Sequence, residues 1–263
     1  MTTVLCVPQW QGSASGKAPR LVVGAHRAAE LVPADEVVTV PVAEAGGDKV
    51  AGVRAFDVLV ENQWLTRQAL AAIDDRVITV GGDCAVDIAP ISAAHARYGD
   101  ALTVLWIDAH PDVYSPQTLP SGAFHGMVVR ALLGDGPAGL ALERHLTPQQ
   151  VIIAGERAGD ASEHEYLAEI GLRRYGVDDL ERVLDGLHGP VYVHIDLDVL
   201  EPSAFGATCY PEPDGVRPQR LIDLVAQVDD IVGAAITEHA PAGDDVDPGE
   251  AEVIRRLGAA LTR

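Results

Sequence analysis

The sequence is poor in basic residues. Of its 263 residues, 19 are lysine or arginine and 39 are aspartate or glutamate, which gives a formal net charge of −20 at pH 7. Nucleic acids and anionic membranes bind basic surfaces, so we expect neither as a partner. Most of the negative charge is expected to be solvated surface, and the remainder is available to surround a bound cation.

Cysteines, aromatic residues and long apolar runs are also scarce. The cysteines (Cys6, Cys84 and Cys209) are odd in number and far apart, which argues against a disulfide framework and favours a reducing compartment. The first residues form an apolar segment with no basic region before it, so we expect neither a signal peptide nor a membrane span, and a cytoplasmic protein. Aromatic content is 5% while hydrophobic content is 48%, which favours a core of aliphatic strands and helices.

Strand-like and helix-like segments alternate along the whole chain. Strands are expected at residues 4–7, 36–40, 76–80, 102–108, 151–154, 172–175, 191–196 and 231–237. Helices are expected at residues 21–31, 54–73, 88–98, 125–133, 162–170, 178–187, 217–228 and 248–261. This alternation indicates an α/β protein with a parallel sheet covered on both faces, in one domain spanning residues 1–263. A (β/α)₈ barrel fits the same count, because periodicity does not give the strand order.

Acidic and metal-binding side chains follow four of the expected strands. They are Asp83 and Cys84; Asp108, His110 and Asp112; Asp196 and Asp198; and Glu238 and His239. In an extended chain, residues two apart point to the same side, so each i, i+2 set is expected to project together. Ligands of open α/β sheets bind at the carboxyl ends of the strands, where these residues lie.

The pattern of carboxylates with an imidazole predicts a site for divalent ions. Hard divalent ions take several carboxylate ligands and keep open positions for water. Two such ions about 3.5–4 Å apart activate a shared water as hydroxide. The residues therefore predict a metal-dependent hydrolase, against the alternative that the loops are simply acidic in an acidic protein.

The same segments resemble those of the ureohydrolase family, which includes arginase and agmatinase. The matching motifs lie at residues 81–84, 106–112, 121–126 and 196–203, with a further match around Glu238, and they occur in the family's order. The resemblance implies a three-layer α/β/α fold with a central eight-stranded parallel sheet rather than a barrel. It also implies a hydrolase that acts on the C–N bonds of linear amidines, takes a guanidino substrate and forms a homo-oligomer, usually a trimer or hexamer.

The resemblance further implies roles for individual residues. Two Mn²⁺ ions per chain are expected, with Cys84 at one ligand position and the other ligands being Asp108, His110, Asp112, Asp196 and Asp198. His125 matches the family's proton-shuttling histidine, and Glu238 matches the carboxylate that pairs with the guanidinium. In the implied reaction a metal-activated hydroxide attacks the guanidino carbon, and Asp112 relays a proton to the leaving amine.

The loop after Asp112 resembles that of arginase more than that of agmatinase. Ser121 is expected to bond a substrate α-carboxylate. Asp160 and Glu163 lie in a segment that resembles the one receiving the α-amino group. The alternative is that these two acids are favoured by the macrodipole at the start of a helix, where Ser162 is the expected N-cap.

Cys84 is the main departure from the family, because it stands where the family has a histidine ligand of the first metal. A thiolate ligand favours softer ions such as Zn²⁺ or Fe²⁺. If Cys84 stays a thiol, the first site is weak and a single ion is expected. His194, two residues before Asp196, is expected to be a core histidine, with support of the site from behind as the alternative.

Further departures affect substrate preference. Tyr114 and Leu119 replace an asparagine and a threonine that contact the α-carboxylate in arginase, and Tyr210 replaces a small hydroxyl residue. Each lost hydrogen bond to a charged group weakens binding by roughly 1.5–3 kcal/mol. Arginine or a close derivative is the expected substrate, and the alternative is Nω-hydroxy-L-arginine, which would give hydroxyurea and ornithine.

Two other functions stay open at this point. One is a mononuclear metal amide hydrolase, as in the structurally related zinc deacetylases. The other is a catalytically degenerate homologue that acts as an interaction subunit. A metal count separates the three: near two ions per chain, near one, or none.

Overall fold

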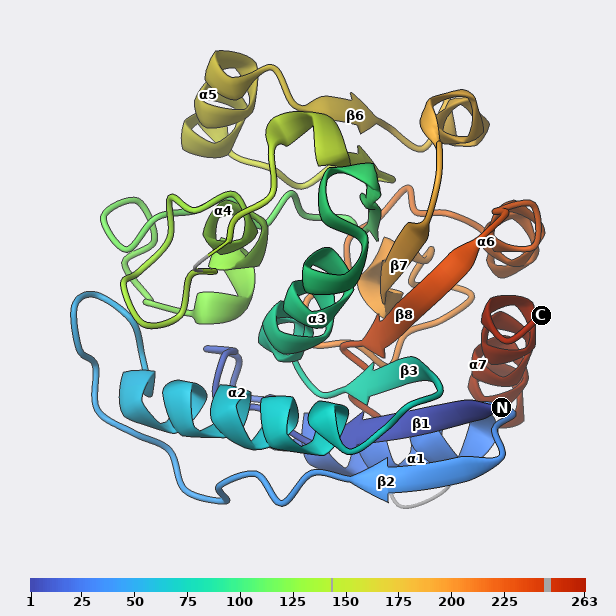
Figure 1. Cartoon of the computed structure of the whole chain (residues 1–263), viewed down its shortest axis with the longest axis horizontal. Coiled ribbons are helices and arrows are strands. Elements are labelled where there is room, and N and C mark those ends of the chain that lie inside the picture. The colour runs from blue at the N-terminus through green and yellow to red at the C-terminus, as the bar shows by residue number, and fades with distance from the viewer. Residues whose placement is uncertain (143, 244–246) are drawn as a thin grey trace.

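A computed structural model describes residues 1–142, 144–243 and 247–263. Its centre is an eight-stranded sheet in the order β2-β1-β3-β8-β7-β4-β5-β6, and every neighbouring pair is parallel (Figure 1). The sheet is open, since β2 and β6 form its two edges. The expected three-layer α/β/α fold is therefore confirmed, and the barrel is excluded.

All eight strands lie close to the expected positions. They are β1 (Thr2–Val7), β2 (Glu36–Thr39), β3 (Arg76–Gly81), β4 (Thr103–Ile107), β5 (Val151–Ala154), β6 (Arg173–Tyr175), β7 (Val191–Asp196) and β8 (Ile231–Thr237). The strands β1, β4, β5 and β7 are buried along their whole length, whereas the edge strands β2 and β6 are mostly half-buried or exposed. Continuous aliphatic runs form these central strands because both faces of the sheet are covered.

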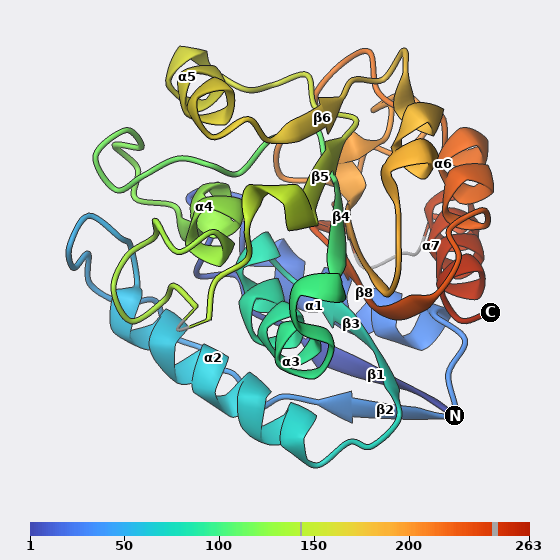
Figure 2. The ribbon, with the colours of Figure 1, turned by 45° about the horizontal axis from the view of Figure 1, so that its top comes forward.

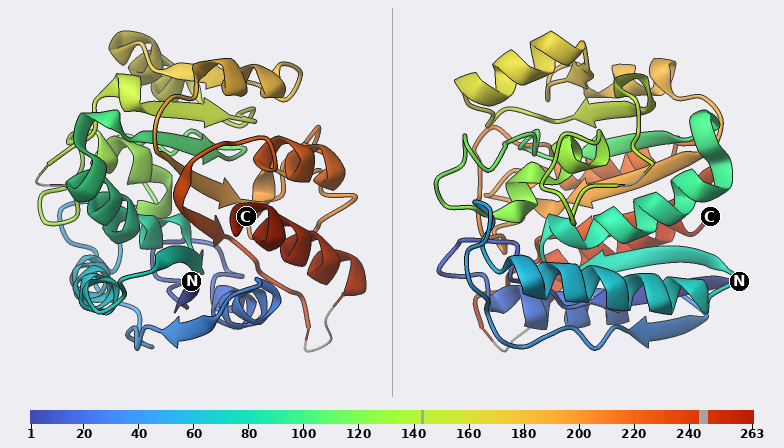
Figure 3. Two further views of the ribbon diagram at one scale, coloured as in Figure 1. Left: turned by 45° about the vertical axis from the view of Figure 1, so that its right-hand side comes forward. Right: turned by 60° about the vertical axis from the view of Figure 1, so that its left-hand side comes forward.

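Helices cover both faces of the sheet (Figure 3). The α-helices are α1 (Arg20–Leu31), α2 (Phe56–Ala71), α3 (Ile88–Tyr98), α4 (Val128–Leu132), α5 (Ala161–Ile170), α6 (Pro218–Val225) and α7 (Pro248–Leu261). One face packs against α1, α6 and α7, through side chains such as Leu221 and Leu257. The other face packs against α2, α3, α4 and α5, through side chains such as Ile91 and Val128. No helix in the described ranges is both long and apolar enough to cross a bilayer.

Two expected helices are wound differently. Residues 178–187 contain the 3₁₀ helix η5 (Leu180–Gly186) rather than an α-helix. Its buried residues Leu180 and Val183 are three apart, which matches the three residues per turn of a 3₁₀ helix. Residues 125–133 begin with the 3₁₀ helix η3 (Phe124–Met127) before α4, and the His125 backbone N–H at its start donates to Gly12 O, 3.1 Å away.

The strand order gathers the acidic strand ends. The strands β3, β8, β7 and β4 are neighbours at the centre of the sheet, and each of the four acidic segments follows one of them (Figure 2). Because all strands are parallel, their carboxyl ends meet at one edge. Segments more than 150 residues apart in the sequence, such as those after β3 and β8, thus lie side by side.

Candidate metal centre

Two similar turns bring carboxylates together at the ends of β4 and β7. Asp108 Oδ1 accepts a hydrogen bond from the His110 backbone N–H at 2.7 Å, and Asp196 Oδ1 accepts one from Asp198 N–H at 2.8 Å. Asp196 is the last residue of β7 and Asp108 directly follows β4, and in both places the chain turns before the residue two positions later. The expectation of an extended i, i+2 face was therefore wrong. The side chains converge because each aspartate caps its own turn, an arrangement typical of Asp and Asn.

His110 lies between the two turns. Its Nδ1 is 3.1 Å from Asp198 Oδ2 and 3.5 Å from Asp108 Oδ1. One ligand atom from each of Asp108, His110 and Asp198 lies within 4.8 Å of the others. Burial alone would lower the pKa of His110, but the charge of Asp198 and the hydrogen bonds to both carboxylates raise it well above its usual value. This cluster can hold a divalent ion, because it offers two oxygens and one nitrogen around one point.

Cys84 lies on the other side of Asp196, in the 3₁₀ helix η1 (Cys84–Asp87). Its Sγ is 2.9 Å from Asp196 Oδ2 and 3.5 Å from Thr237 Oγ1. Two further sets of ligand atoms fall within 4.8 Å around this sulfur: one with Asp196 and Glu238, the other with Asp108 and His194. Burial and the neighbouring charge of Asp196 raise the pKa of the Cys84 thiol well above its usual value. The thiol would ionise here only beside a cation.

Asp112 and Glu238 both adopt left-handed backbone conformations, with φ of 53° and 64°. Such strain in a non-glycine residue costs on the order of 1–3 kcal/mol and gathers at functional sites. Each carboxylate has one buried oxygen, Asp112 Oδ2 and Glu238 Oε2, without a hydrogen-bond partner. Buried polar atoms are nearly always paired, so these two oxygens fit a site that binds a cation or a substrate.

The electrostatics of the cluster also fit bound cations. Five buried carboxylates gather here: Asp108, Asp112, Asp196, Asp198 and Glu238. Among the described residues, histidines are the only basic side chains that pair with them. Burial, and then repulsion from Asp108, raises the pKa of Asp112 well above its usual value, and burial raises that of Asp198 to about 6. Isolated buried charges are too costly to keep, and divalent ions offset that cost.

His125 and Glu238 form a pair beside the cluster. His125 Nδ1 is 3.1 Å from Glu238 Oε1. Burial alone would lower the pKa of His125, but the hydrogen bond and charge of Glu238 raise it above its usual value. The Tyr210 ring lies near both site histidines, with centroid distances of 5.3 Å to His125 and 6.4 Å to His110.

The expected substrate-binding residues lie around the loop before η3. Ser121 is exposed, and its Oγ accepts a hydrogen bond from the Ala123 backbone N–H. Burial, and then the nearby carboxylates of Glu163 and Asp160, raise the pKa of the Tyr114 hydroxyl well above its usual value. Asp160 is exposed whereas Glu163 is buried, and burial raises the pKa of Glu163 to about 7. Of the two acids, only Asp160 is open to a ligand.

Asp160, not Ser162, is the N-cap of α5. Its carboxylate accepts hydrogen bonds from the Ser162 and Glu163 backbone N–H groups, and the Glu163 side chain accepts one from the Asp160 N–H. This reciprocal pair is a capping box. The expectation of Ser162 as the cap was wrong, because helix α5 begins one residue earlier, at Ala161.

Sequence reasoning gave Arg157 no structural role. Its guanidinium donates to five backbone carbonyls, those of Gly155, Asp198, Val199, Glu212 and Pro213. It thereby fixes the turn that carries Asp198. No local signal could have identified this role, since the carbonyls come from three separate segments.

Asp83 is also structural. It is fully buried and accepts hydrogen bonds from Gln9 Nε2 and from the Gly12 and Ala85 backbone N–H groups. A Cβ at position 12 would lie 2.3 Å from Asp83 Oδ1, so only glycine fits there. The glycine-rich loop at residues 11–17 was the available signal, and it marks the close approach of the first loop to the site.

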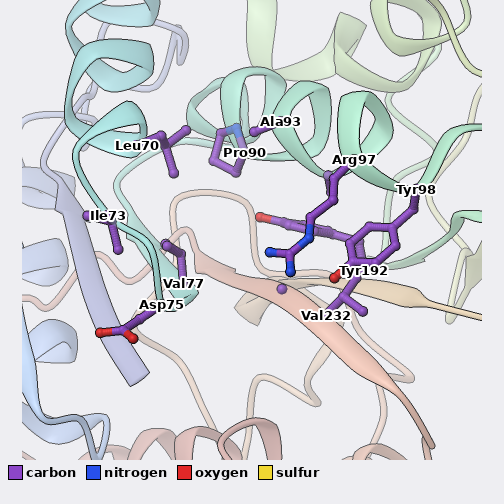
Figure 4. A pocket seen from close by; sticks show the side chains of 12 residues that line it. Leu70, Ile73, Asp75, Val77, Pro90, Ala93, Arg97, Tyr98, Tyr192 and Val232 are labelled. Carbon is purple, nitrogen blue, oxygen red and sulfur yellow. The ribbon is translucent and has the colours of Figure 1, made fainter. Parts of the chain in front are cut away.

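A cavity of about 130 Å³ lies elsewhere, between α2 and α3 and the sheet (Figure 4). Leu70, Val77, Pro90, Tyr192 and Val232 are among its lining residues. Val77, Tyr192 and Val232 lie at the amino ends of their strands, opposite the acidic edge. None of the metal-binding clusters is found there, so we place the chemistry at the acidic edge.

Comparison with known proteins gives a consistent result. A family model described as "Arginase family" matches residues 18–262. The chain is 29% identical, over 247 residues that cover 89% of each protein, to the N(omega)-hydroxy-L-arginine amidinohydrolase of Streptomyces lavendulae. It is 28% identical over 174 residues to the arginase of Staphylococcus aureus (strain COL), an alignment that covers 57% of this chain and 56% of that arginase.

Solved structures show the same fold. The arginase of Bacillus subtilis superimposes with a TM-score of 0.85, covering 99% of this chain and 98% of its own, at 21% sequence identity. The proclavaminate amidino hydrolase of Streptomyces clavuligerus superimposes with a TM-score of 0.75, covering 99% of this chain and 90% of its own, at 20% identity.

Proposed function

Because the chain belongs to the arginase family and is an amidinohydrolase, we propose that it cleaves the guanidino C–N bond of an arginine derivative, with Nω-hydroxy-L-arginine preferred over arginine. The observation that carries this proposal is that Glu238 lies beside the buried carboxylate cluster and that its Oε2 has no hydrogen-bond partner. A guanidinium is the kind of group that such an oxygen binds, through charge-assisted N–H donors.

The proposed metal centre holds two divalent ions. Asp108, His110, Asp196 and Asp198 would hold one, and Cys84, Asp108, Asp112 and Asp196 the other. The clusters with ligand atoms within 4.8 Å support the grouping of Asp108, His110 and Asp198 and the grouping of Cys84 with either Asp108 or Asp196. Mn²⁺ is the first ion to test, and Zn²⁺ and Fe²⁺ follow because a sulfur ligand favours softer ions. When bound, such a pair lowers the pKa of a shared water and supplies the nucleophile.

The remaining steps belong to side chains of this chain. Glu238 keeps Oε1 on His125 and offers Oε2 to the guanidinium, which orients the guanidino carbon. Asp112 Oδ2 takes the proton released by the attacking water and delivers it to the leaving nitrogen. One C–O bond forms, one C–N bond breaks, and the amine leaves with the transferred proton. His125 exchanges protons between this site and solvent.

The amino-acid end of the substrate is proposed to bind on the loop side. Ser121 would donate to the α-carboxylate, and the exposed carboxylate of Asp160 would receive the α-amino group. Tyr114 would border this subsite, because its hydroxyl lies near the carboxylates of Asp160 and Glu163. Glu163 is buried and would act through Asp160 and Tyr114 rather than on the substrate.

One feature of the site favours the hydroxylated substrate. A hydroxyguanidine is less basic than a guanidine and brings an extra oxygen, which suits a centre with a sulfur ligand. The relative from Streptomyces lavendulae, which aligns over 89% of this chain, bears the name of this activity.

The test compares both substrates on protein loaded with Mn²⁺, Zn²⁺ or Fe²⁺. Ornithine is measured from each substrate, together with urea from arginine and hydroxyurea from Nω-hydroxy-L-arginine. We expect kcat/KM to be higher for the hydroxylated substrate. Faster turnover of plain arginine would overturn the substrate preference. Absence of both reactions from protein with two bound ions would overturn the activity itself.

The metal count addresses the rival functions. Elemental analysis near two ions per chain supports the proposed centre, near one supports a mononuclear amide hydrolase, and none supports a degenerate interaction subunit. We further propose a trimer or hexamer in the cytoplasm. Light scattering in solution tests the first point, and cell fractionation the second.

A further inference from the structure

His194 lies directly beneath the proposed metal centre. It is on β7, two residues before Asp196, and is fully buried. Its cross-strand neighbours are Trp106 on β4 and Ala235 on β8. The imidazole stacks on the Trp106 indole with centroids 3.4 Å apart and planes 4° apart. Trp106 Nε1 in turn donates to Asp108 Oδ2 at 3.0 Å, so the stack also orients one of the metal-binding carboxylates.

One ring nitrogen of His194 is held by a buried carboxylate. Nδ1 lies 2.9 Å from Asp87 Oδ2, and Asp87 is itself fully buried. The other oxygen of Asp87 accepts a hydrogen bond from the Tyr192 hydroxyl at 2.5 Å. Because a carboxylate accepts, Nδ1 carries the hydrogen and Nε2 keeps a free electron pair. This is the arrangement in which a carboxylate orients a histidine that binds metal.

The free nitrogen shares a neighbour with Cys84, because His194 Nε2 and Cys84 Sγ each lie 3.5 Å from Thr237 Oγ1. A ring nitrogen of His194, Cys84 Sγ and a carboxylate oxygen of Asp108 all lie within 4.8 Å of one another. Within the described part of the chain, the contact of Nε2 is the Thr237 hydroxyl, at 3.5 Å, which is beyond normal hydrogen-bond length.

We propose that His194 Nε2 is an additional ligand of the ion held by Cys84 and Asp108, with Asp87 and Tyr192 as positioning residues behind it. The inference rests on the proposed metal centre and deepens it. Position 84 carries a cysteine where the family has a histidine ligand, and His194 on β7 would supply an imidazole nitrogen to the same ion. The resulting set of sulfur, nitrogen and oxygen ligands favours Zn²⁺, Fe²⁺ or Co²⁺ over Mn²⁺.

The experiment separates the two nitrogens of the ring. In His194→Asn the amide N–H replaces Nδ1–H toward Asp87, while Nε2 is removed. Metal-free wild type and variant are titrated with Zn²⁺ and Co²⁺ by calorimetry, and absorption spectra of the Co²⁺ forms are recorded. We expect the affinity of one of two ions to fall by more than the 10–100-fold typical of residues behind a ligand. The ligand-field bands should also shift, while the sulfur-to-cobalt charge-transfer band from Cys84 remains.

Two further variants serve as comparisons. Asp87→Asn leaves the imidazole in place but removes the charge that orients it, so we expect a loss of about 10–100-fold. His95→Asn is the matched control, because His95 is also buried, has a bonded Nδ1 and an unpartnered Nε2, and belongs to none of the metal-binding clusters among described residues. It should leave both affinities and the spectrum unchanged. Thermal unfolding of each variant shows whether it folds.

The outcomes are distinguishable from those of the proposed function. If wild type binds two ions and a folded His194→Asn binds both with wild-type affinity and an unchanged Co²⁺ spectrum, His194 is not a ligand and the inference fails alone. If wild type binds no divalent ion, the proposed metal centre fails, and this inference with it.

Discussion

At the residue scale, Cys84 is the residue on which we expect the metal preference of the proposed centre to depend. Its sulfur is buried, 2.9 Å from Asp196 Oδ2, where burial raises the pKa of the thiol and only a cation can favour the thiolate. With Cys84 and His194 as ligands, the ion at this position would be bound by sulfur, nitrogen and oxygen instead of by nitrogen and oxygen alone. The preference among metals, and through it among substrates, would then depend on this residue.

Replacing Cys84 by histidine tests this dependence. We expect Cys84→His to bind more Mn²⁺ and to raise kcat/KM for arginine by roughly tenfold or more, because the thiolate's charge and softness are removed. Elemental analysis and urea formation measure the two effects. Cys6→Ser is the control, since Cys6 is buried away from the site, with its sulfur 3.7 Å from His26 Nδ1. Unchanged metal content and unchanged activity in Cys84→His would remove Cys84 from the account of specificity.

His239 gives a pH dependence at the residue scale. Burial lowers its pKa from about 6.5 to about 4, and its Nδ1 lies 3.1 Å from Gly24 O. The unfolded chain therefore binds a proton between pH 6.5 and 4 that the folded chain rejects. Stability from this residue is complete above pH 6.5 and is lost as the pH falls through 4, by up to about 3 kcal/mol.

The variant His239→Asn keeps an N–H donor for Gly24 O but cannot titrate. We expect its free energy of unfolding to fall less than that of wild type between pH 7 and pH 4, as measured by urea denaturation at both pH values. His188→Asn, at an exposed histidine, should behave as wild type. An identical pH dependence in His239→Asn and wild type would contradict the assignment.

At the scale of single elements, the start of α5 combines stability and binding in one residue. Asp160 caps the helix and is also the proposed receiver of the α-amino group. Asp160→Ala should lower stability by roughly 1 kcal/mol through loss of the cap. Asp160→Ser keeps a capping oxygen without the charge, so it should restore most of the stability while the KM stays raised. If the serine variant recovers both stability and KM, Asp160 is a cap and nothing more.

The hydrogen bonds of Arg157, here called the Arg157 clamp, are a second feature at this scale. Its guanidinium joins the segment after β5 to the turn after β7 through five backbone carbonyls. The three N–H donors of a lysine cannot reproduce this pattern. Arg157→Lys is expected to lower the free energy of unfolding by roughly 2–4 kcal/mol and to weaken metal binding through Asp198. Arg220→Lys is the control, since its ion pair with Glu181 lies at the surface. Equal stability of the two variants would argue against the clamp.

At the scale of the whole molecule, part of the excess negative charge is concentrated in five carboxylates that are buried at one edge of the sheet. Burial, with repulsion from neighbouring carboxylates, raises the folded-state pKa of Asp112 and Asp196, and burial raises that of Asp198 to about 6. The metal-free folded state thus holds protons that the unfolded chain releases above pH 4. Its stability falls as the pH rises through this window, so the apo protein should be less stable at pH 8 than at pH 5.

Metal removal tests this prediction. We expect EDTA to lower Tm far more at pH 8 than at pH 5, because bound ions compensate carboxylates that are ionised only at the higher pH. Thermal unfolding with and without saturating Mn²⁺ or Zn²⁺ at both pH values measures the difference, and taking the difference at each pH cancels contributions from other residues such as His239. A chelator effect of equal size at both pH values would contradict the buried-charge argument.

The sequence by itself determined the layers of this protein and the place of its chemistry. Aliphatic strands alternate with amphipathic helices, and residues close together in the chain carry that periodicity, so eight strands in a parallel sheet covered by helices could be predicted. The open three-layer form, rather than a barrel, was implied by the resemblance to the ureohydrolases. The acidic residues that follow the strands could be assigned to one edge, because parallel strands end on the same side. Motifs in family order added the activity, which the family match bears out.

Only the tertiary structure decided how these residues meet. Asp108 and Asp196 gather their neighbours by capping turns, and Asp160 takes the helix cap expected of Ser162. His194 pairs with Asp87, 107 residues away, and lies near Cys84. Such contacts depend on strand order and on side-chain packing between distant segments, and neither is encoded in local periodicity. The aspartates that follow β4 and β7 could be identified from the sequence, whereas the position of the His194 imidazole beside them could be identified only from the fold.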